Sequence, residues 1–442
     1  MLSRIIALFV LLPNFLLAQH TISGVFSPAK DYKVALLYKV TPTVSEYISN
    51  AEVQKDGSFQ FQLDVAAASG MYRIVYAVPQ EDYNFDVIYN GKENIVLSFN
   101  TETGVEFKAS SENKLLKSYT KSMSAVTHSI SNYFRENRKD TLALNAIFNT
   151  QRDVQLNFEK LAEKTMALQF IKANKPYIPR KYQDVKTYVN NLKKHYFDYI
   201  DFNNKTLQSS SFLEERMNNY IFGMSSDGVN EINNYKNNID VFYNAMKLAP
   251  EAIKRILLVS LWQQMADLDI EDVANYISNK YLIEIAKSLN DNELVDALSQ
   301  YKNLSIGSKA PEFTIKIEKN KKKVSIKLSE LNSAEKYIII FWNSGCPHCL
   351  DEIPQLQNFV KNYKKLKLKV IAVGLEDDNK TWKEKIKSFP EFINVLGLGK
   401  WDNEIGNKYG VKETPTYFVL DKAKHIIDKP YDFEALKVFL MN

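Results

Sequence analysis

The chain of 442 residues carries 57 Lys and Arg against 52 Asp and Glu, and its formal net charge of +5 is too small for this length to indicate a nucleic-acid-binding protein. The 25 Tyr, 25 Phe and 45% hydrophobic residues exclude a disordered chain and indicate well-packed cores. The length predicts two to three domains, and only two cysteines exclude a protein stabilised by several disulfides.

The N-terminus has the pattern of an export signal. Arg4 precedes an apolar run at residues 5–17, and the small residue Ala18 follows it. This layout predicts a secretory signal peptide over residues 1–19. A transmembrane helix needs about 20 apolar residues and this run is shorter. We therefore expect a soluble protein of the bacterial periplasm without a transmembrane anchor.

Residues 20–109 predict strands. Apolar and polar residues alternate on both sides of Asp56-Gly57 and again on both sides of Asn90-Gly91. Both dipeptides are strong signals for hairpin turns. The economical interpretation is an antiparallel β-sandwich.

Residues 110–303 change to a helical period and predict an all-helical middle domain. Two further helices are expected at 153–171 and 250–268. The first apolar stripe has residues three or four apart, as on one face of a helix. Its members are Leu115, Tyr119, Met123, Val126 and Ile130.

Residues 304–442 alternate strands with helices, which indicates an α/β domain with a central sheet. Strands are expected at 337–342, 368–376, 414–421 and 424–428, and helices at 347–366, 380–389, 404–411 and 432–440. The whole chain is therefore predicted to be a multidomain α+β protein. Both of its cysteines lie where a buried strand meets a helix.

Cys346 and Cys349 form a Cys-Pro-His-Cys motif at that helix start. Positions three apart on a helix bring two thiols near disulfide distance. Cys346 lies at the positive end of the helix dipole, which stabilises a thiolate and makes it the nucleophile. Cys349, one turn further in, would resolve the mixed disulfide formed with a client protein.

Other uses of the two cysteines fit less well. A zinc site would need two more ligands, and His128, His195 and His425 are scattered along the chain. Attachment of c-type haem needs a histidine where Leu350 stands. A purely structural disulfide this short would restrict the unfolded chain little. We expect no metal and no cofactor beyond a redox-active Cys346–Cys349 disulfide.

The two residues between the cysteines have separate expected roles. Pro347 occupies the first helical turn, where its missing N–H costs nothing. His348 would stabilise the thiolate if its imidazole is protonated near Cys346, and the alternative is an exposed histidine without a role.

The segments "FWNSGCPHC", "YGVKETPTYFVLD" and "APEF" resemble the thioredoxin-fold domain of the TlpA/ResA type of exported thiol–disulfide oxidoreductases. The resemblance covers about residues 305–442. The order of β-rich, helical and thioredoxin-like segments also resembles a three-part architecture among exported TlpA-like proteins. The resemblance implies an enzyme that exchanges disulfides with exported proteins and is reset by a membrane electron donor or acceptor.

The resemblance also assigns residues. Cys346 matches the attacking cysteine and Cys349 the resolving one. Pro415, after Thr414, matches a cis-proline whose neighbouring backbone pairs with a client peptide. Together with Trp342 of the first motif, these two form the expected substrate-binding set.

Glu352, three residues past Cys349, matches an acidic residue that influences the thiol protons. Glu352 also shares a helix face with Cys349, so it could shuttle a proton if it is desolvated. The alternative is a solvated glutamate. Pro354 lies inside the same predicted helix, where it would produce a kink.

Three departures bear on the direction of electron flow. Gly345 stands where a tryptophan is common, Glu413 stands where a glycine often precedes Thr-Pro, and the Pro-His pair is the one associated with DsbA-type oxidants. The scaffold favours a reductase and the motif favours an oxidant; we expect a reductase. A thiol peroxidase and a non-catalytic binding scaffold are the other hypotheses.

Overall fold

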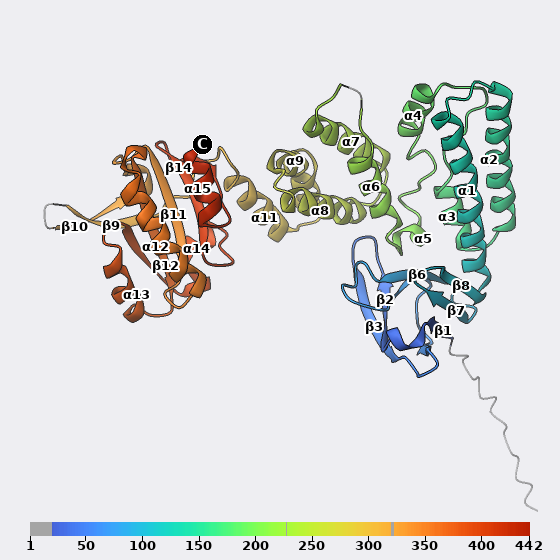
Figure 1. Ribbon diagram of the computed structural model, residues 1–442, viewed down its shortest axis with the longest axis horizontal. Coiled ribbons are helices and arrows are strands. Elements are labelled where there is room, and N and C mark those ends of the chain that lie inside the picture. The colour runs from blue at the N-terminus through green and yellow to red at the C-terminus, as the bar shows by residue number, and fades with distance from the viewer. Residues whose placement is uncertain (1–19, 227, 320–321) are drawn as a thin grey trace, which may run out of the picture. The chain divides into compact units, whose positions relative to one another are not determined.

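The computed structural model describes residues 20–226, 228–319 and 322–442 (Figure 1). The predicted signal peptide, residues 1–19, lies outside this description. The chain forms two compact units, one reaching to Gln264 and the other spanning Met265–Asn442.

The first unit begins with a sandwich of two four-stranded sheets, ordered β4-β1-β7-β8 and β3-β2-β5-β6. The strands bury aromatic and aliphatic side chains between the sheets, among them Phe26, Leu37, Phe59, Ile74 and Leu97. The strands are β1 (Thr21–Ser27), β2 (Val34–Val40), β3 (Ser45–Glu52), β4 (Ser58–Gln62), β5 (Gly70–Val75), β6 (Asn84–Tyr89), β7 (Ile95–Asn100) and β8 (Gly104–Ala109). The predicted β-sandwich is confirmed.

Both predicted hairpins are wrong, because β3 and β4, and likewise β6 and β7, belong to different sheets. Gly57 and Gly91 do adopt the expected positive φ, +85° and +73°. A glycine with positive φ is compatible both with a tight hairpin and with a turn that connects two different sheets. One pair also departs from the antiparallel plan, since β1 and β7 run parallel with Ile22 opposite Ile95.

Helices fill the rest of the first unit. The predicted apolar stripe is confirmed in the first helix, where Tyr119, Met123, Val126 and Ile130 are buried. The helices are α1 (Ser111–Arg135), α2 (Thr141–Leu161), α3 (Ala167–Ala173), α4 (Val185–Lys194), α5 (Lys205–Gln208), α6 (Phe212–Gly223), α7 (Glu231–Ala245) and α8 (Glu251–Asp267). The last of these confirms the helix expected at 250–268 and runs across the boundary between the units.

The helix expected at 153–171 is divided between α2 and α3. Lys164, between them, has a positive φ of 66° and ends the helical path. The buried Glu112 then accepts hydrogen bonds from the backbone N–H groups of Met166 (3.2 Å) and Ala167 (2.8 Å). A carboxylate stabilises a helix N-terminus, so α3 starts anew there.

The second unit contains a five-stranded sheet of order β13-β12-β11-β14-β15. Its strands are β11 (Lys336–Trp342), β12 (Leu368–Glu376), β13 (Ile393–Leu398), β14 (Thr416–Asp421) and β15 (Ile426–Asp428). The pairs β11–β12 and β12–β13 are parallel, while β14 runs antiparallel to β11. The predicted α/β domain is confirmed; β13 was not expected.

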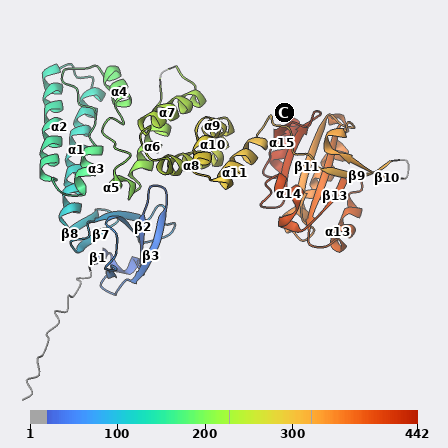
Figure 2. The ribbon, with the colours of Figure 1, turned by 180° about the vertical axis from the view of Figure 1, so that it is seen from behind.

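Helices α12 (Pro347–Asn362), α13 (Lys380–Lys385) and α15 (Phe433–Met441) share one apolar core with one face of this sheet. The other face packs against α14 (Glu404–Lys408) through Ile405 and against the segment before β11. That segment includes an unpredicted hairpin of β9 (Thr314–Lys319) and β10 (Lys322–Lys327), which extends away from the sheet in both views (Figures 1 and 2).

Three helices before the sheet belong to the same compact unit: α9 (Glu271–Ile277), α10 (Ile283–Ser288) and α11 (Asn292–Asn303). Glu271 forms an ion pair with Lys429 and accepts a hydrogen bond from the Ile306 N–H at 2.7 Å. Gln300 donates to the Asn407 carbonyl at 2.6 Å. The units therefore divide inside the predicted helical segment 110–303 rather than at its end. Within the described ranges, no helix has both the length and the apolar character needed to span a bilayer.

Candidate active site

The site is built where β11 ends and α12 begins. The strand carries six consecutive buried residues up to Trp342, and Asn343–Gly345 then form a short loop. Cys346 is the N-cap of α12, with its Sγ accepting a hydrogen bond from the Cys349 N–H at 3.3 Å. Pro347 takes the first helical position, as expected. The half-buried thiol thus takes the place of the usual capping oxygen.

A second loop meets this thiol. The Cys346 Sγ donates a hydrogen bond to the Thr414 carbonyl at 3.3 Å. The peptide bond between Thr414 and Pro415 is cis. Both residues are half-buried and immediately precede β14, which pairs with β11. The fold therefore brings together the cysteines and the Thr-Pro pair that the sequence singled out 68 residues apart.

The two thiols have opposite electrostatic environments. Burial by itself raises the pKa of Cys346. Hydrogen bonds from the side chain and N–H of Cys349, from the side chain of Thr414 and from the backbone N–H of His348 outweigh it, so the pKa lies below the ordinary thiol value. Burial raises the pKa of Cys349 to about 12, with its hydrogen bond to Cys346 adding to the effect. Both cysteines are free thiols, and Cys349 is fully buried. This asymmetry suits a partly accessible nucleophile paired with a protected resolving thiol.

His348 is exposed. Its backbone N–H contributes to the lowered pKa of the Cys346 thiol. The stabilisation of the thiolate by a protonated imidazole stays a prediction.

Glu352 is half-buried behind the cysteines. Its Oε2 accepts hydrogen bonds from the Tyr417 hydroxyl at 2.7 Å and from the Phe433 N–H at 2.9 Å. Burial and then the hydrogen bond to Glu352 raise the pKa of Tyr417, and the charge of Cys349 acts in the same direction. Tyr417 thus links Glu352 electrostatically to Cys349. Pro354 lies on the exposed side of α12, which continues past it.

Trp342 is fully buried, with its ring edge-to-face against Phe389 at 5.4 Å between centroids. The side chain supports the site from the core of the unit instead of lining its surface.

Sequence reasoning missed three polar residues beside the nucleophile: Asn343, Ser344 and Glu376. Glu376 ends β12 and accepts hydrogen bonds from both residues of the loop. A signal was available, because Glu376 directly follows the apolar run from Val370 to Leu375 and is the only acidic residue of β12. Among the residues that the structure describes, no group of three or more His, Cys, Asp or Glu could hold a metal ion.

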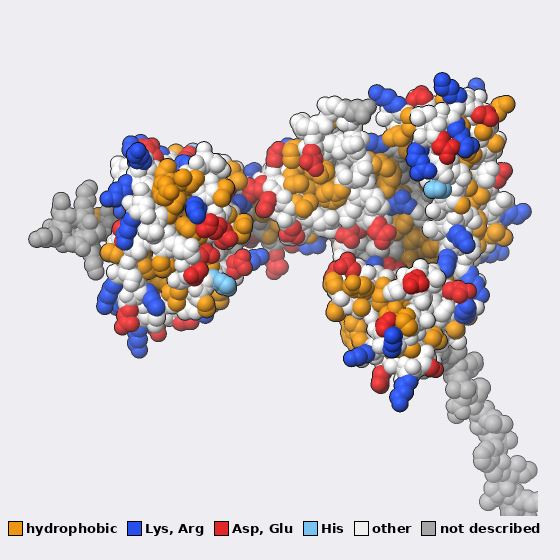
Figure 3. Space-filling model, viewed as in Figure 1, with side chains coloured by type: hydrophobic (Ala, Val, Ile, Leu, Met, Phe, Trp, Pro, Cys, Tyr) orange, Lys and Arg blue, Asp and Glu red, His pale blue; other side chains and the backbone are white. Residues whose placement is uncertain are grey.

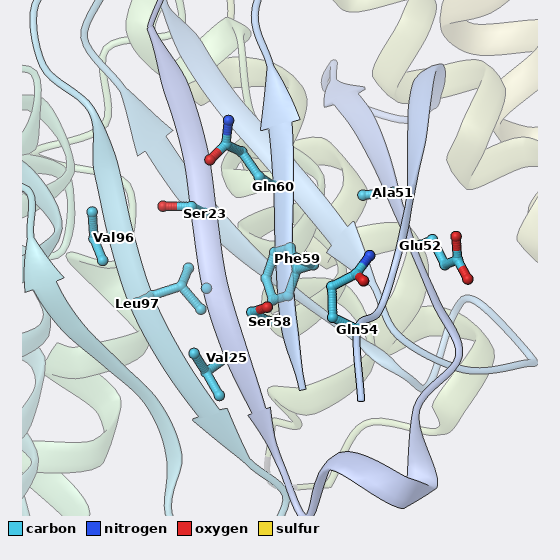
Figure 4. Close-up of a pocket in the computed structure, with 11 residues that line it drawn as sticks. Ser23, Val25, Ala51, Glu52, Gln54, Ser58, Phe59, Gln60, Val96 and Leu97 are labelled. Atoms are coloured by element: carbon cyan, nitrogen blue, oxygen red, sulfur yellow. The ribbon is translucent and has the colours of Figure 1, made fainter. Parts of the chain in front are cut away.

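A pocket of about 500 Å³ lies on the β-sandwich of the first unit. Figure 4 shows Ser23 beside Gln60 on neighbouring strands, with Val96 on one side of them and Glu52 at the opposite end of the lining. Glu52 is the one ionisable side chain among its lining residues. The lining contains no pair of groups suited to acid–base or nucleophilic catalysis.

This chain is similar to known proteins, and the family model that it matches covers residues of the second unit. Residues 306–429 match the model of the AhpC/TSA family. The chain is 27% identical over 132 residues to the thiol-disulfide oxidoreductase ResA of Bacillus cereus, covering 30% of this chain and 72% of that protein. It is 29% identical over 102 residues to the sporulation thiol-disulfide oxidoreductase A of Bacillus subtilis, covering 22% and 58%.

Two solved structures are similar as well. A domain of a possible thiol-disulfide isomerase from Cytophaga hutchinsonii is 29% identical and covers 31% of this chain and 90% of that one, with a TM-score of 0.26. A thioredoxin-like protein from Bacteroides caccae is 19% identical and covers 60% and 96%, with a TM-score of 0.33. The C-terminal region of this chain is therefore a thioredoxin-like domain of the AhpC/TSA type, similar to the ResA thiol-disulfide oxidoreductases.

Proposed function

We propose that the protein is an exported thiol–disulfide oxidoreductase that reduces disulfides in periplasmic client proteins. One observation carries the proposal: the Cys346 sulfur lies at the start of α12 with a lowered pKa, between the Cys349 N–H and the Thr414 carbonyl. The proposed export rests on the signal-like pattern of residues 1–19.

In the first step the Cys346 thiolate attacks one sulfur of a client disulfide. A mixed disulfide forms, the client S–S bond breaks, and the departing client thiolate takes up a proton from solvent. The residues Thr414 and Pro415 would border the client segment, because the Thr414 carbonyl already faces the attacking sulfur.

In the second step Cys349 loses its proton and attacks the Cys346 sulfur. The Cys346–Cys349 disulfide forms and the second client thiol is released, so the client gains two electrons and the enzyme loses two. Tyr417 and Glu352 are the polar side chains placed to influence the proton on Cys349. A membrane electron donor would then reduce the enzyme disulfide.

The opposite direction has a specific observation in its favour. A lowered pKa stabilises the reduced form of Cys346 as its thiolate and makes the enzyme disulfide more oxidising. A disulfide-forming oxidant, which would pass electrons to a membrane acceptor, is therefore the second candidate.

Client proteins are the proposed partners, with no nucleic acid among them. On the face seen in Figure 3, Lys and Arg side chains are scattered among acidic and apolar ones, which supports protein partners. The first unit would serve recruitment or assembly. If the protein were only a binding scaffold, the variant Cys346→Ser would keep its biological role.

The deciding experiment is an equilibrium titration of the Cys346–Cys349 pair in glutathione buffers, combined with an insulin-reduction assay. A potential near about −270 mV supports a reductase, whereas one near about −120 mV identifies an oxidant. Failure to form a reversible disulfide overturns the proposal. Rapid consumption of peroxide by the wild type but not by Cys346→Ser would instead identify a thiol peroxidase.

A further inference from the structure

A buried carboxylate lies beside the loop that precedes the nucleophile. Glu376 ends β12 and is only 5% exposed. Its backbone is fixed by the neighbouring strand β13, since Glu376 pairs with Leu398 and its carbonyl accepts a hydrogen bond from the Gly399 N–H at 3.0 Å. The carboxylate is thus held by the sheet, a rigid element, while the residues that it contacts belong to a loop.

The loop supplies the side-chain hydrogen bonds that Glu376 receives. Ser344 donates its N–H to Oε1 at 2.7 Å and its hydroxyl to Oε2 at 2.8 Å. Asn343 donates its amide to Oε2 at 3.3 Å. Within the described part of the chain, no Lys or Arg forms an ion pair with Glu376. A buried carboxylate is costly unless hydrogen bonds compensate it, so the loop and Glu376 stabilise each other.

These bonds continue to Cys346 through Asn343. The Asn343 amide also donates to the Leu375 carbonyl at 2.6 Å, and its Oδ1 accepts from the Gly345 N–H at 2.9 Å. The Asn343 carbonyl in turn accepts from the Cys346 N–H at 3.1 Å. Every residue from 343 to 346 is therefore bonded either to Glu376 or to Asn343.

We infer that Glu376 is a positioning residue for the thiol–disulfide chemistry, acting through Ser344 and Asn343 to hold Cys346 in its N-cap conformation. The inference rests on the proposed oxidoreductase function. The N-cap conformation keeps Sγ within 3.3 Å of the Cys349 N–H and of the Thr414 carbonyl. A loosened loop loses this alignment, and with it the hydrogen bond from the Cys349 N–H that stabilises the thiolate.

The variants Glu376→Gln and Glu376→Ala test the inference. Alanine removes all the acceptors, and glutamine turns one oxygen into a donor that faces the donors of Ser344 and Asn343. Asp377→Asn is the matched control, because it removes one negative charge from the next position, where the side chain is 79% exposed.

Two quantities are measured on the reduced proteins: the pH midpoint of Cys346 alkylation and the rate of exchange with a small disulfide. We expect Glu376→Ala to slow exchange by about 10-fold or more, since small misplacements of reacting atoms have large kinetic effects. The alkylation midpoint should rise toward the ordinary thiol value. Glu376→Gln should change both quantities less, and Asp377→Asn neither.

If Glu376 has a purely structural role, Glu376→Ala will lower the melting temperature but leave the alkylation midpoint and the exchange rate of the folded protein unchanged. That result would overturn the inference. If Glu376→Ala does not fold, the test rests on Glu376→Gln. A wild-type alkylation midpoint and a wild-type exchange rate in that variant would also overturn the inference. Effects of Glu376→Gln and Ser344→Ala that simply add would also contradict the shared network. If the wild type exchanges no disulfides but its alkylation midpoint still depends on Glu376, the proposed function fails and the positioning role remains.

Discussion

The candidate site has two halves, each with a cysteine and a carboxylate, and the halves work differently. In the nucleophile half, Glu376 receives hydrogen bonds from the loop before Cys346. In the resolving half, Glu352 receives them from Tyr417 and from the Phe433 N–H. The first carboxylate contacts the loop before the nucleophile, and the second is linked to the buried thiol through Tyr417. Two carboxylates beside one pair of cysteines therefore make unlike contacts.

Replacing each cysteine in turn should have the largest effects and should block a different reaction step in each half. Cys346→Ser should reduce exchange by about 1,000-fold or more, because the hydroxyl is not ionised at neutral pH and cannot replace the thiolate. Cys349→Ser should complete the first step and accumulate the mixed disulfide, visible as a client adduct on non-reducing gels. If Cys346→Ser formed the same amount of client adduct, Cys349 would be the attacking thiol, and the proposed roles of the two cysteines would be wrong.

The pH dependence of the dithiol form should differ between the halves. The folded-state pKa of Cys349 is raised to about 12, above the value of about 8.5 for an unfolded thiol. The folded state therefore holds the Cys349 proton more tightly, and stability falls as pH rises from about 8.5 toward 12. Cys346 has the opposite sign, since its lowered pKa gives stability that is lost as pH falls through that pKa.

Denaturant unfolding of the reduced protein at a series of pH values measures this difference. The alkaline loss should be smaller in Cys349→Ala, which has no buried thiol to titrate. An identical alkaline loss in both proteins would show that another group is responsible.

Breaking the contact inside the resolving half should have a smaller effect. Tyr417→Phe removes the hydroxyl that donates to Glu352 at 2.7 Å and leaves the Phe433 N–H as a partner. We expect a loss of about 1.5–3 kcal/mol in unfolding free energy, typical of a hydrogen bond to a charged group. Stopped-flow measurement should show slower resolution of the mixed disulfide with an unchanged first step. A slower first step instead would place Tyr417 in the nucleophile half.

The smallest change is expected from His348→Ala. The backbone N–H that acts on Cys346 is retained, and only the exposed imidazole is lost. The alkylation midpoint of Cys346 should rise slightly, by less than one pH unit and by less than in Glu376→Ala. A larger shift would make the imidazole, rather than the loop, the main source of thiolate stabilisation.

Local patterns were enough to predict the end of β11, the start of α12 and the place of both cysteines there. The run of apolar residues before Cys346 and the proline after it define the strand, the helix start and the N-cap from neighbouring residues alone. The cysteine roles followed from their place on that helix.

Contacts between distant segments could not be predicted in the same way. Glu376 meets Ser344 across 32 residues only because β11 and β12 pair in parallel with Trp342 opposite Gly374. The same limit explains the failed hairpins at Gly57 and Gly91. A glycine turn shows that the chain reverses but does not show which sheet receives the next strand.

The ion pair between Glu271 and Lys429 joins α9 to the segment after β15, within one compact unit. A fragment cut at residue 304 would leave the Ile306 N–H without its acceptor and Lys429 without its counter-ion. A duplication, fusion or recombination that moved the redox domain to a new context would keep these contacts only if it carried α9–α11 with it. The useful boundary for such a transplant is the break near Met265.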